Sequence, residues 1–152
     1  MKKLAIKIAA PIIRIFWKIF QPQTIGVRVI LTKGEQFLLV KHSYSDSWYL
    51  CGGGMKKQET FQKAIQRELK EELGIVSEVF KLHGVYNNFY EGKKDSIVVF
   101  SSEIKEIPQI NDAEIESFDF FKFENLPSKI SPGTKKRIEE FVLGNGPFYG
   151  DW

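Results

Sequence analysis

Short apolar runs separated by turn residues occupy the middle of the chain, a pattern typical of β-strands. The first two runs flank a turn at 32–35 that contains Gly34, and they are expected to form a hairpin. The run at 117–123 alternates apolar and polar residues with a period of two, and residues 76–90 indicate one or two further strands. The strands expected with definite ends are 24–31, 36–42, 96–102 and 117–123.

Two other segments have a helical period. The first extends roughly from Thr60, a suitable N-cap, to just before Gly74, a suitable C-cap. The second is expected over residues 134–143, beginning near Ser131 or Pro132. Strands, one helix, more strands and a final helix in this order predict an α+β or layered αβα domain. The apolar stripe of the first helix, expected to pack on the sheet, comprises Phe61, Ala64, Ile65, Leu69 and Leu73.

The N-terminal segment, residues 1–22, has a different pattern. Residues 2–20 place basic side chains on one side of a helix and apolar side chains largely on the other, with Pro11 expected to kink it. A membrane-surface helix, a helix packed on the domain or on a second subunit, and a processed segment are all consistent with it. A transmembrane span is not expected, because the longest uncharged run, 8–13, is far shorter than the roughly 20 residues required.

Length and charge add to this picture. The 152 residues suit one domain, expected over 23–144 and followed by a flexible tail at 145–152. The net charge of +3 comes from the first 20 residues, which hold five basic residues and no acidic one, so no nucleic-acid partner is expected. The single cysteine, Cys51, excludes an internal disulfide and is consistent with a cytoplasmic protein, in contact with the inner membrane surface if residues 2–20 bind it.

Candidate chemistry is concentrated on the first helix. Glu68, Glu71 and Glu72 are neighbours on one helical face, where like charges disfavour joint ionisation. They also lie at the C-terminal end, where carboxylates oppose the helix dipole. An all-oxygen cluster of this kind suits a divalent cation such as Mg²⁺ or Mn²⁺.

The glutamates belong to a longer motif with the spacing G-x5-E-x7-R-E-U-x-E-E-x-G-U, where U is aliphatic. The chain therefore resembles the Nudix hydrolases. That resemblance covers about residues 24–143 and implies a Nudix-type α/β/α sandwich in which a mixed sheet lies between helices and the motif forms a loop, a helix and a loop. It also implies metal-dependent cleavage of a nucleoside diphosphate linked to a moiety X by an activated water. The matching residues are Gly53, Glu59, Arg67, Glu68, Leu69, Glu71, Glu72, Gly74 and Ile75.

The resemblance also implies roles for individual residues. The metal ligands would be Glu68, Glu71 and Glu72 together with a backbone carbonyl of the glycine turn, Gly52 or Gly53. Arg67 would pair with Glu59 and align the carboxylates, while Gly53 and Gly74 bracket the motif. The general base would be one of the motif glutamates or a loop acid ahead of a late strand. The candidate catalytic set is thus Glu68, Glu71, Glu72, Arg67 and Glu114, with Glu116 as a second loop acid.

Substrate contacts are expected at the glycine turn and on the first strand. Glycines let a phosphate approach the backbone closely, which favours Gly53 and Gly54, and Arg28 is a candidate phosphate contact. Asp95 is a candidate for facing the cleft. Aromatic residues around the turn and the later strands could stack a nucleobase, although such residues more often belong to the core or its rim. These aromatic residues are Tyr44, Trp48, Tyr49, Tyr86, Phe89 and Tyr90.

The chain departs from the common family pattern at two positions. Cys51 replaces the proline that usually precedes the double glycine, and Gln58 replaces the glycine that usually precedes the first motif glutamate. Cys51 is expected to be a small buried filler rather than a nucleophile. Markers of several family subgroups are absent, so X stays open. The partner is expected to be a nucleotide-type small molecule, with a homodimer as a further hypothesis, and the alternative function is a catalytically silent nucleotide-binding module at a membrane surface.

Overall fold

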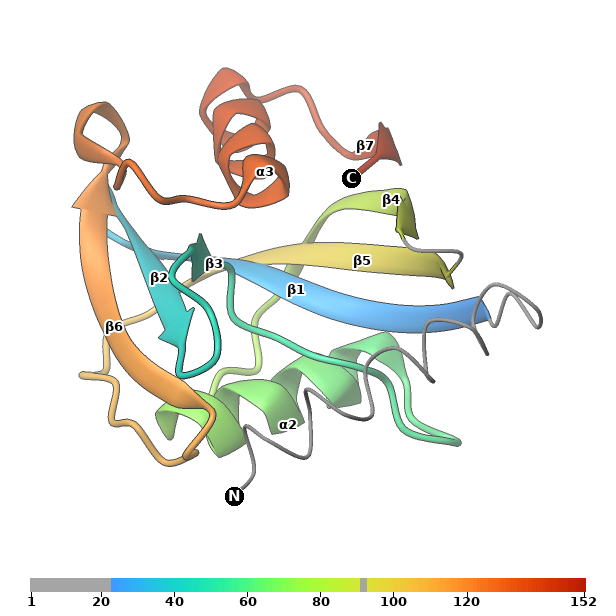
Figure 1. The fold of residues 1–152 in the computed structure, drawn as a ribbon, viewed down its shortest axis with the longest axis horizontal. Coiled ribbons are helices and arrows are strands. Elements are labelled where there is room, and N and C mark those ends of the chain that lie inside the picture. Colours follow the sequence, from blue (N-terminus) through green and yellow to red (C-terminus); the bar gives the residue numbers. More distant parts are fainter. Residues whose placement is uncertain (1–22, 91–92) are drawn as a thin grey trace.

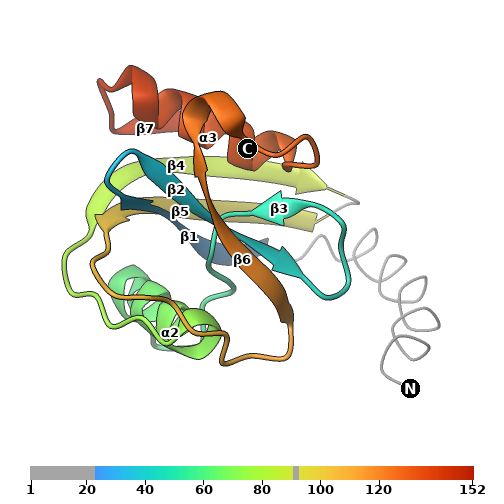
Figure 2. The ribbon, with the colours of Figure 1, turned by 90° about the vertical axis from the view of Figure 1, so that its left-hand side faces the viewer.

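The computed structural model describes residues 23–90 and 93–152. The amphipathic helix expected over residues 2–20 lies outside the described residues. In the part of the chain that is described, the strands form one mixed sheet between the helices α2 (Phe61–Leu73) and α3 (Pro132–Leu143), as Figures 1 and 2 show. This arrangement is the α/β/α sandwich that the sequence predicts.

The sheet has the order β3-β2-β1-β5-β4-β7, and β6 pairs with β2. The β1–β5 and β4–β7 pairs are parallel, and the other pairs are antiparallel. The short helix η1 (Phe123–Asn125) follows β6. The strand bounds are β1 Gln23–Lys33, β2 Gln36–His42, β3 Trp48–Tyr49, β4 Lys81–Tyr90, β5 Lys93–Glu103, β6 Ile115–Lys122 and β7 Phe148–Asp151.

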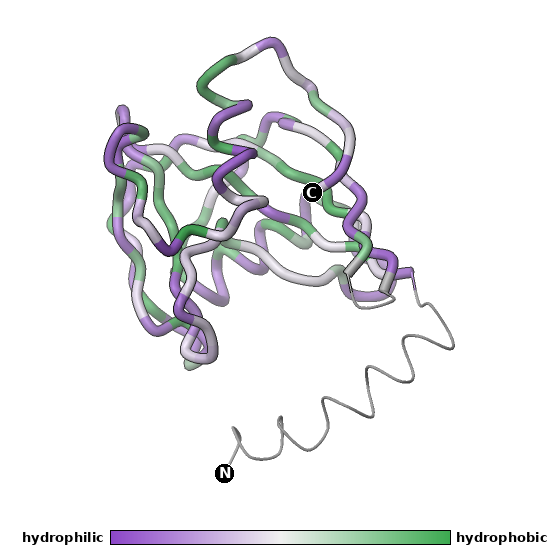
Figure 3. The backbone as a smooth tube through the Cα atoms, turned by 45° about the horizontal axis from the view of Figure 1, so that its top comes forward, coloured by the Kyte–Doolittle hydropathy of each residue, from purple (hydrophilic) through white to green (hydrophobic). Residues whose placement is uncertain are grey.

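Alternation along the strands builds an apolar core on each face of the sheet. Side chains of a strand point to opposite faces in turn, so Val29 and Leu31 of β1 pack toward α2 while Ile30 between them packs toward α3. Along the tube of Figure 3, green hydrophobic stretches accordingly alternate with purple hydrophilic ones. Leu69 of α2 and Ile138 of α3 are fully buried against these two faces.

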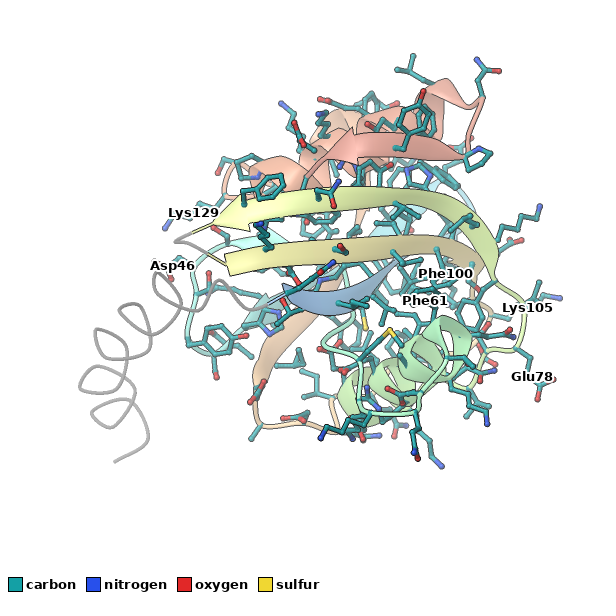
Figure 4. The ribbon with its side chains drawn as sticks, turned by 90° about the vertical axis from the view of Figure 1, so that its right-hand side faces the viewer. Asp46, Phe61, Glu78, Phe100, Lys105 and Lys129 are labelled. Atoms are coloured by element: carbon teal, nitrogen blue, oxygen red, sulfur yellow. The ribbon has the colours of Figure 1, made fainter. Side chains whose placement is uncertain are left out.

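Helix α2 begins and ends where its caps predict. The side chain of Thr60 accepts a hydrogen bond from the backbone N–H of Lys63, and Gly74 ends the helix in the left-handed conformation, with φ of 66°. The predicted apolar stripe is buried from Ala64 onward. Phe61, labelled in Figure 4, differs because it lies in the first turn of the helix. It is 42% exposed.

The loop between β2 and β3 is attached to the segment that precedes α3. The backbone N–H of Trp48 donates to the carbonyl of Lys129 (2.8 Å), and that of Ser131 donates to the carbonyl of Trp48 (3.0 Å). Asp46 and Lys129, labelled in Figure 4, form an exposed ion pair at 3.7 Å. These contacts hold the loop that carries Tyr44 at a fixed place beside β2.

The C-terminal residues differ from the flexible tail expected over 145–152. Residues 148–151 form β7, which pairs with β4, and the backbone N–H of Trp152 donates to the carbonyl of Asn87 (2.9 Å). The Trp152 ring packs on Tyr86 and lies against Arg137. The glycine-rich composition suggested a loose end, but pairing with the open edge of β4 and aromatic packing hold these residues in place.

Among the described residues, no helix is long and apolar enough to cross a membrane.

Candidate active site

The glycine turn is held against β1 rather than free. The carbonyl of Cys51 accepts from the N–H of Val29 (3.0 Å), and the carbonyl of Gly53 accepts from the N–H of Val27 (2.9 Å). Gly52 between them has a φ of 132°, and a Cβ there would collide with the carbonyl of Val27. Glycine is therefore required at this position by both conformation and space.

Glu68 lies directly over the next glycine of the turn. A Cβ built on Gly53 would lie 2.5 Å from the nearer carboxylate oxygen of Glu68, whereas a Cβ on Gly54 would meet nothing within 4 Å. The lack of a side chain at Gly53 thus makes room for an acidic group above the backbone. The structure brings the glycine turn and the glutamate face of α2 together, as the sequence predicts.

Arg67 organises the carboxylates around it. Its Nε and Nη2 donate to the two oxygens of Glu59 (2.8 and 2.9 Å), and Nη1 donates to Glu68 (2.6 Å) and Glu71 (3.0 Å). Nη2 also donates to the carbonyl of Gly54 (3.0 Å). These bonds from Arg67 hold the pKa of Glu59 down at about 2. The predicted Arg67–Glu59 pair is present, and it extends into a network that joins the turn to the helix.

Glu72 is the most buried of the acidic residues at this site. Its Oε2 accepts from Cys51 Sγ (2.6 Å) and from the N–H of Gly52 (3.2 Å), and only 8% of the residue is exposed. Burial, helped by the charge of Glu68, raises its pKa to about 7 against the lowering effects of the two donors and of Arg28. A buried carboxylate that is costly to ionise gains most from a neighbouring cation.

The donors at this site fit a hard divalent ion. The carbonyls of Cys51, Gly53 and Gly54 each accept a hydrogen bond, whereas no described residue donates to the carbonyl of Gly52 or to Oε1 of Glu72. These oxygens and the carboxylate of Glu68 are of the type that Mg²⁺ and Mn²⁺ prefer. Within residues 23–90 and 93–152, no three acidic, histidine or cysteine side chains already stand in a coordinating arrangement, and Arg67 is bonded to Glu68 and Glu71.

The two loop acids face different surroundings. Glu116 is exposed and pairs with Lys41 (3.1 Å). The backbone carbonyl of Glu114 accepts from the N–H of Ser43 (2.8 Å), which brings Glu114 beside the β2–β3 loop. Of the two, Glu114 is therefore the acid whose backbone is bonded to the loop that carries Tyr44.

A cavity of about 500 Å³ adjoins the glycine turn. All three residues predicted to contact substrate, Arg28, Gly53 and Gly54, line it. Asp95 of β5 also lines it and accepts a hydrogen bond from the hydroxyl of Thr24 (2.6 Å). The other residues of this wall occupy no fixed position of the motif, and the available signal for them was the basic pair Lys56 and Lys57 shortly after the glycine run. These additional lining residues include Met55, Lys56 and Lys57.

The aromatic candidates separate into core and surface. Tyr86 is buried, and Trp48 packs into the core beneath α3. Tyr49 packs against the other core and bonds Ser45 through its hydroxyl (2.8 Å). Tyr44 is 63% exposed and stacks on His42 with a ring separation of 5.1 Å, while Phe89 is 70% exposed on β4.

Comparison with known proteins shows the family of the chain. The NUDIX domain model matches residues 22–141, so the chain belongs to the Nudix family. It is a Nudix pyrophosphohydrolase. The ADP-ribose pyrophosphatase of Methanocaldococcus jannaschii is 26% identical over 136 residues, with 83% of this chain and 77% of that protein covered.

Solved structures show the same fold. A MutT NUDIX hydrolase from Burkholderia pseudomallei superposes with a TM-score of 0.72 at 23% identity, with 78% of this chain and 98% of that chain covered. A UDP-X diphosphatase superposes with a TM-score of 0.74 at 25% identity, with 86% of this chain and 68% of that chain covered.

Proposed function

We propose that this protein hydrolyses a phosphoanhydride bond in a nucleoside diphosphate linked to X, with ADP-ribose and UDP-linked compounds as the first candidates. The observation that carries the proposal is the buried Glu72, which is bonded to the N–H of Gly52 and has its pKa raised to about 7, while Glu68 lies over the adjacent Gly53. The similarity to an ADP-ribose pyrophosphatase and a UDP-X diphosphatase supports the substrate class.

Glu68, Glu72 and the Gly52 carbonyl would hold the divalent ion, Mg²⁺ or Mn²⁺, with Glu71 as a further ligand. When bound, the ion neutralises the diphosphate and activates a water. Arg67 keeps Glu68 and Glu71 on the side of the glycine turn through its bonds to both. Its contact with the Gly54 carbonyl fixes the turn relative to α2.

The cavity beside the glycine turn would bind the substrate. Arg28, Lys56 and Lys57 supply positive charge for the phosphates, and Gly53 and Gly54 allow close approach to the backbone. Asp95 offers a hydrogen-bond acceptor to X. Glu114 would accept the proton of the attacking water.

The first test measures nucleoside monophosphate release from ADP-ribose, UDP-sugars, nucleoside triphosphates and diadenosine polyphosphates, with Mg²⁺ and with EDTA. We expect one class of these compounds to be hydrolysed with Mg²⁺ and not with EDTA, and we expect Glu72→Gln to lose this activity. Nucleotide binding without turnover of any compound would instead support the binding module.

For the proton acceptor, Glu114→Gln is expected to lower kcat by roughly 10²- to 10⁴-fold, while Glu116→Gln, a matched change two residues away, leaves kcat unaffected.

For residues 2–20 we propose contact with an anionic membrane surface on the cytoplasmic side, because five basic residues lie in this segment. Binding of the full chain to vesicles containing an anionic lipid is expected to weaken with salt and to be lost when residues 1–20 are deleted. A deletion that changes the oligomeric state and leaves vesicle binding unchanged would favour packing on a second copy of the chain.

A further inference from the structure

Cys51 contacts one of the proposed metal ligands. Its Sγ lies 2.6 Å from Oε2 of Glu72, although 21 residues separate the two along the chain. Both groups are buried, with 1% of Cys51 and 8% of Glu72 exposed. The thiol therefore acts as a hydrogen-bond donor to a carboxylate in a setting from which most water is excluded.

The contact fixes which oxygen of Glu72 is available. The thiol and the N–H of Gly52 both donate to Oε2, and no described residue donates to Oε1. Two donors on a single oxygen define the rotation of the carboxylate about its final bond. Oε1 keeps open acceptor capacity, and so does the carbonyl of Gly52, to which no described residue donates.

Cys51 is itself held in place. Its backbone carbonyl accepts from the N–H of Val29 on β1, and its side chain belongs to the core cluster between the sheet and α2. Glu72 is carried by the last turn of α2, whose neighbours Leu69 and Leu73 are buried in the same cluster. The thiol thus joins two rigid elements, the strand-paired glycine turn and the end of the helix.

We propose that Cys51 is a positioning residue, whose thiol holds the carboxylate of Glu72 in the orientation that binds the divalent ion. The inference rests on the proposed function, since it assumes that Glu72 is a metal ligand. A donor behind a ligand sets its orientation and commonly contributes 10- to 100-fold to metal affinity. Proline, which the family pattern usually has at this position, offers no donor, so this chain has a side-chain contact in its place.

The test measures Mn²⁺ binding to the full chain by electron paramagnetic resonance of free Mn²⁺, at one pH and without nucleotide. Cys51→Ala removes the donor and is expected to weaken Mn²⁺ binding about tenfold or more. Cys51→Ser keeps an O–H donor and is expected to restore most of the affinity. Val40→Ala removes methyl groups from the same core cluster but leaves both hydrogen-bond donors of Glu72 in place, and it is expected to bind Mn²⁺ as the wild type does.

The variants distinguish failure of the inference from failure of the proposed function. If the wild type does not bind Mn²⁺, the proposed metal site and the inference both fail. Both also fail if Glu72→Gln binds Mn²⁺ as tightly as the wild type. Suppose instead that the wild type binds Mn²⁺ and that Glu72→Gln abolishes this binding. Unchanged Mn²⁺ affinity in Cys51→Ala would then overturn the inference alone. Unfolding midpoints in EDTA establish that each variant is folded. If Cys51 had only a packing role, Cys51→Ala would lower the unfolding midpoint without changing the Mn²⁺ affinity.

Discussion

Gln58 shows the cost of departing from glycine at a tight turn. It has a φ of 61°, a left-handed conformation that costs a non-glycine residue roughly 1–2 kcal/mol. The turn nevertheless forms, because the N–H groups of Lys56 and Glu59 bond within it, to the Glu59 carboxylate and the Lys56 carbonyl. The site thus retains its geometry despite local strain in the backbone.

Replacing Gln58 with glycine is expected to stabilise the fold. The strain energy that is relieved exceeds the free-energy cost of glycine's greater freedom in the unfolded chain, which is about 0.5–1 kcal/mol. The free energy of unfolding, measured in urea, is therefore expected to rise by about 0.5–1 kcal/mol. Gln62→Gly is the matched control, because Gln62 lies in helix α2, where the same change costs about 1 kcal/mol. A loss of stability in both variants would contradict the explanation by strain.

Glu72 makes the stability of the metal-free protein depend on pH. Its pKa is raised from 4.5 to about 7 in the folded state, so the folded chain holds the proton more tightly than the unfolded chain. This contribution is full below pH 4.5 and is lost as the pH rises through 7. Without metal, the free energy of unfolding should therefore fall by about 3 kcal/mol from this group across that range.

The Glu72 contribution is isolated by comparison with a variant. In EDTA, wild type and Glu72→Gln are unfolded with urea at pH 5, 6, 7 and 8, and the difference between them is expected to change across this range. His42 and His83, whose pKa values burial lowers, titrate in both proteins and cancel. Mg²⁺ at pH 8 should stabilise the wild type and not the variant; a difference independent of pH would refute the account.

At the scale of elements, the site is an interface between the glycine turn and α2. Gly53 lies beneath the carboxylate of Glu68, and Arg67 links the helix to the carbonyl of Gly54. The two glycines differ in the space around them although they are adjacent in the sequence. Their alanine variants therefore separate the geometry of the site from the general flexibility of the turn.

Gly53→Ala is expected to weaken Mn²⁺ binding about tenfold or more, because its Cβ would displace the carboxylate of Glu68. The stability loss should stay small, since the displaced group is the end of a flexible side chain. Gly54→Ala, whose Cβ meets nothing within 4 Å, is expected to bind as the wild type does. Equal effects of the two variants in an Mn²⁺ titration would argue against this role of Gly53.

At the scale of the whole molecule, the C-terminal strand completes the face opposite the site. Arg137 of α3 is fully buried and lies 3.7 Å from the ring centre of Tyr86. Its guanidinium donates to Glu140 (2.9 Å) and to the carbonyl of Asp151 (3.3 Å), while the Trp152 ring lies 5.4 Å away. A buried charge needs such compensation, so β7 and Trp152 are part of the fold.

Trp152→Ala is expected to destabilise the protein by about 2 kcal/mol, because it removes a partly buried ring from Tyr86 and Arg137. The matched control is Tyr149→Ala in β7, whose side chain is 91% exposed and should change the free energy of unfolding by less than about 0.5 kcal/mol. Urea unfolding measures both. A loose tail would instead give similarly small effects at the two positions.

The local features of this protein are determined by its sequence. The period of the apolar residues and the caps Thr60 and Gly74 specify α2, because hydrogen bonds within a few residues decide where a helix begins and ends. The i, i+3 and i+4 spacing brings the motif glutamates to one face whatever surrounds the helix. The pairing of Arg67 with Glu59 could likewise be predicted from the motif.

Contacts between distant segments were decided only by the tertiary structure. The donor from Cys51 to Glu72, the location of Arg28 with Gly53 in one cavity, and the pairing of β7 with β4 all depend on the register and packing of separate elements. Glu114 and Glu116 are equivalent in sequence, and only the pairing of β6 with β2 bonds the backbone of one to the β2–β3 loop and pairs the other with Lys41. Such contacts arise from the burial of apolar surface shared by the whole chain, which no local pattern specifies.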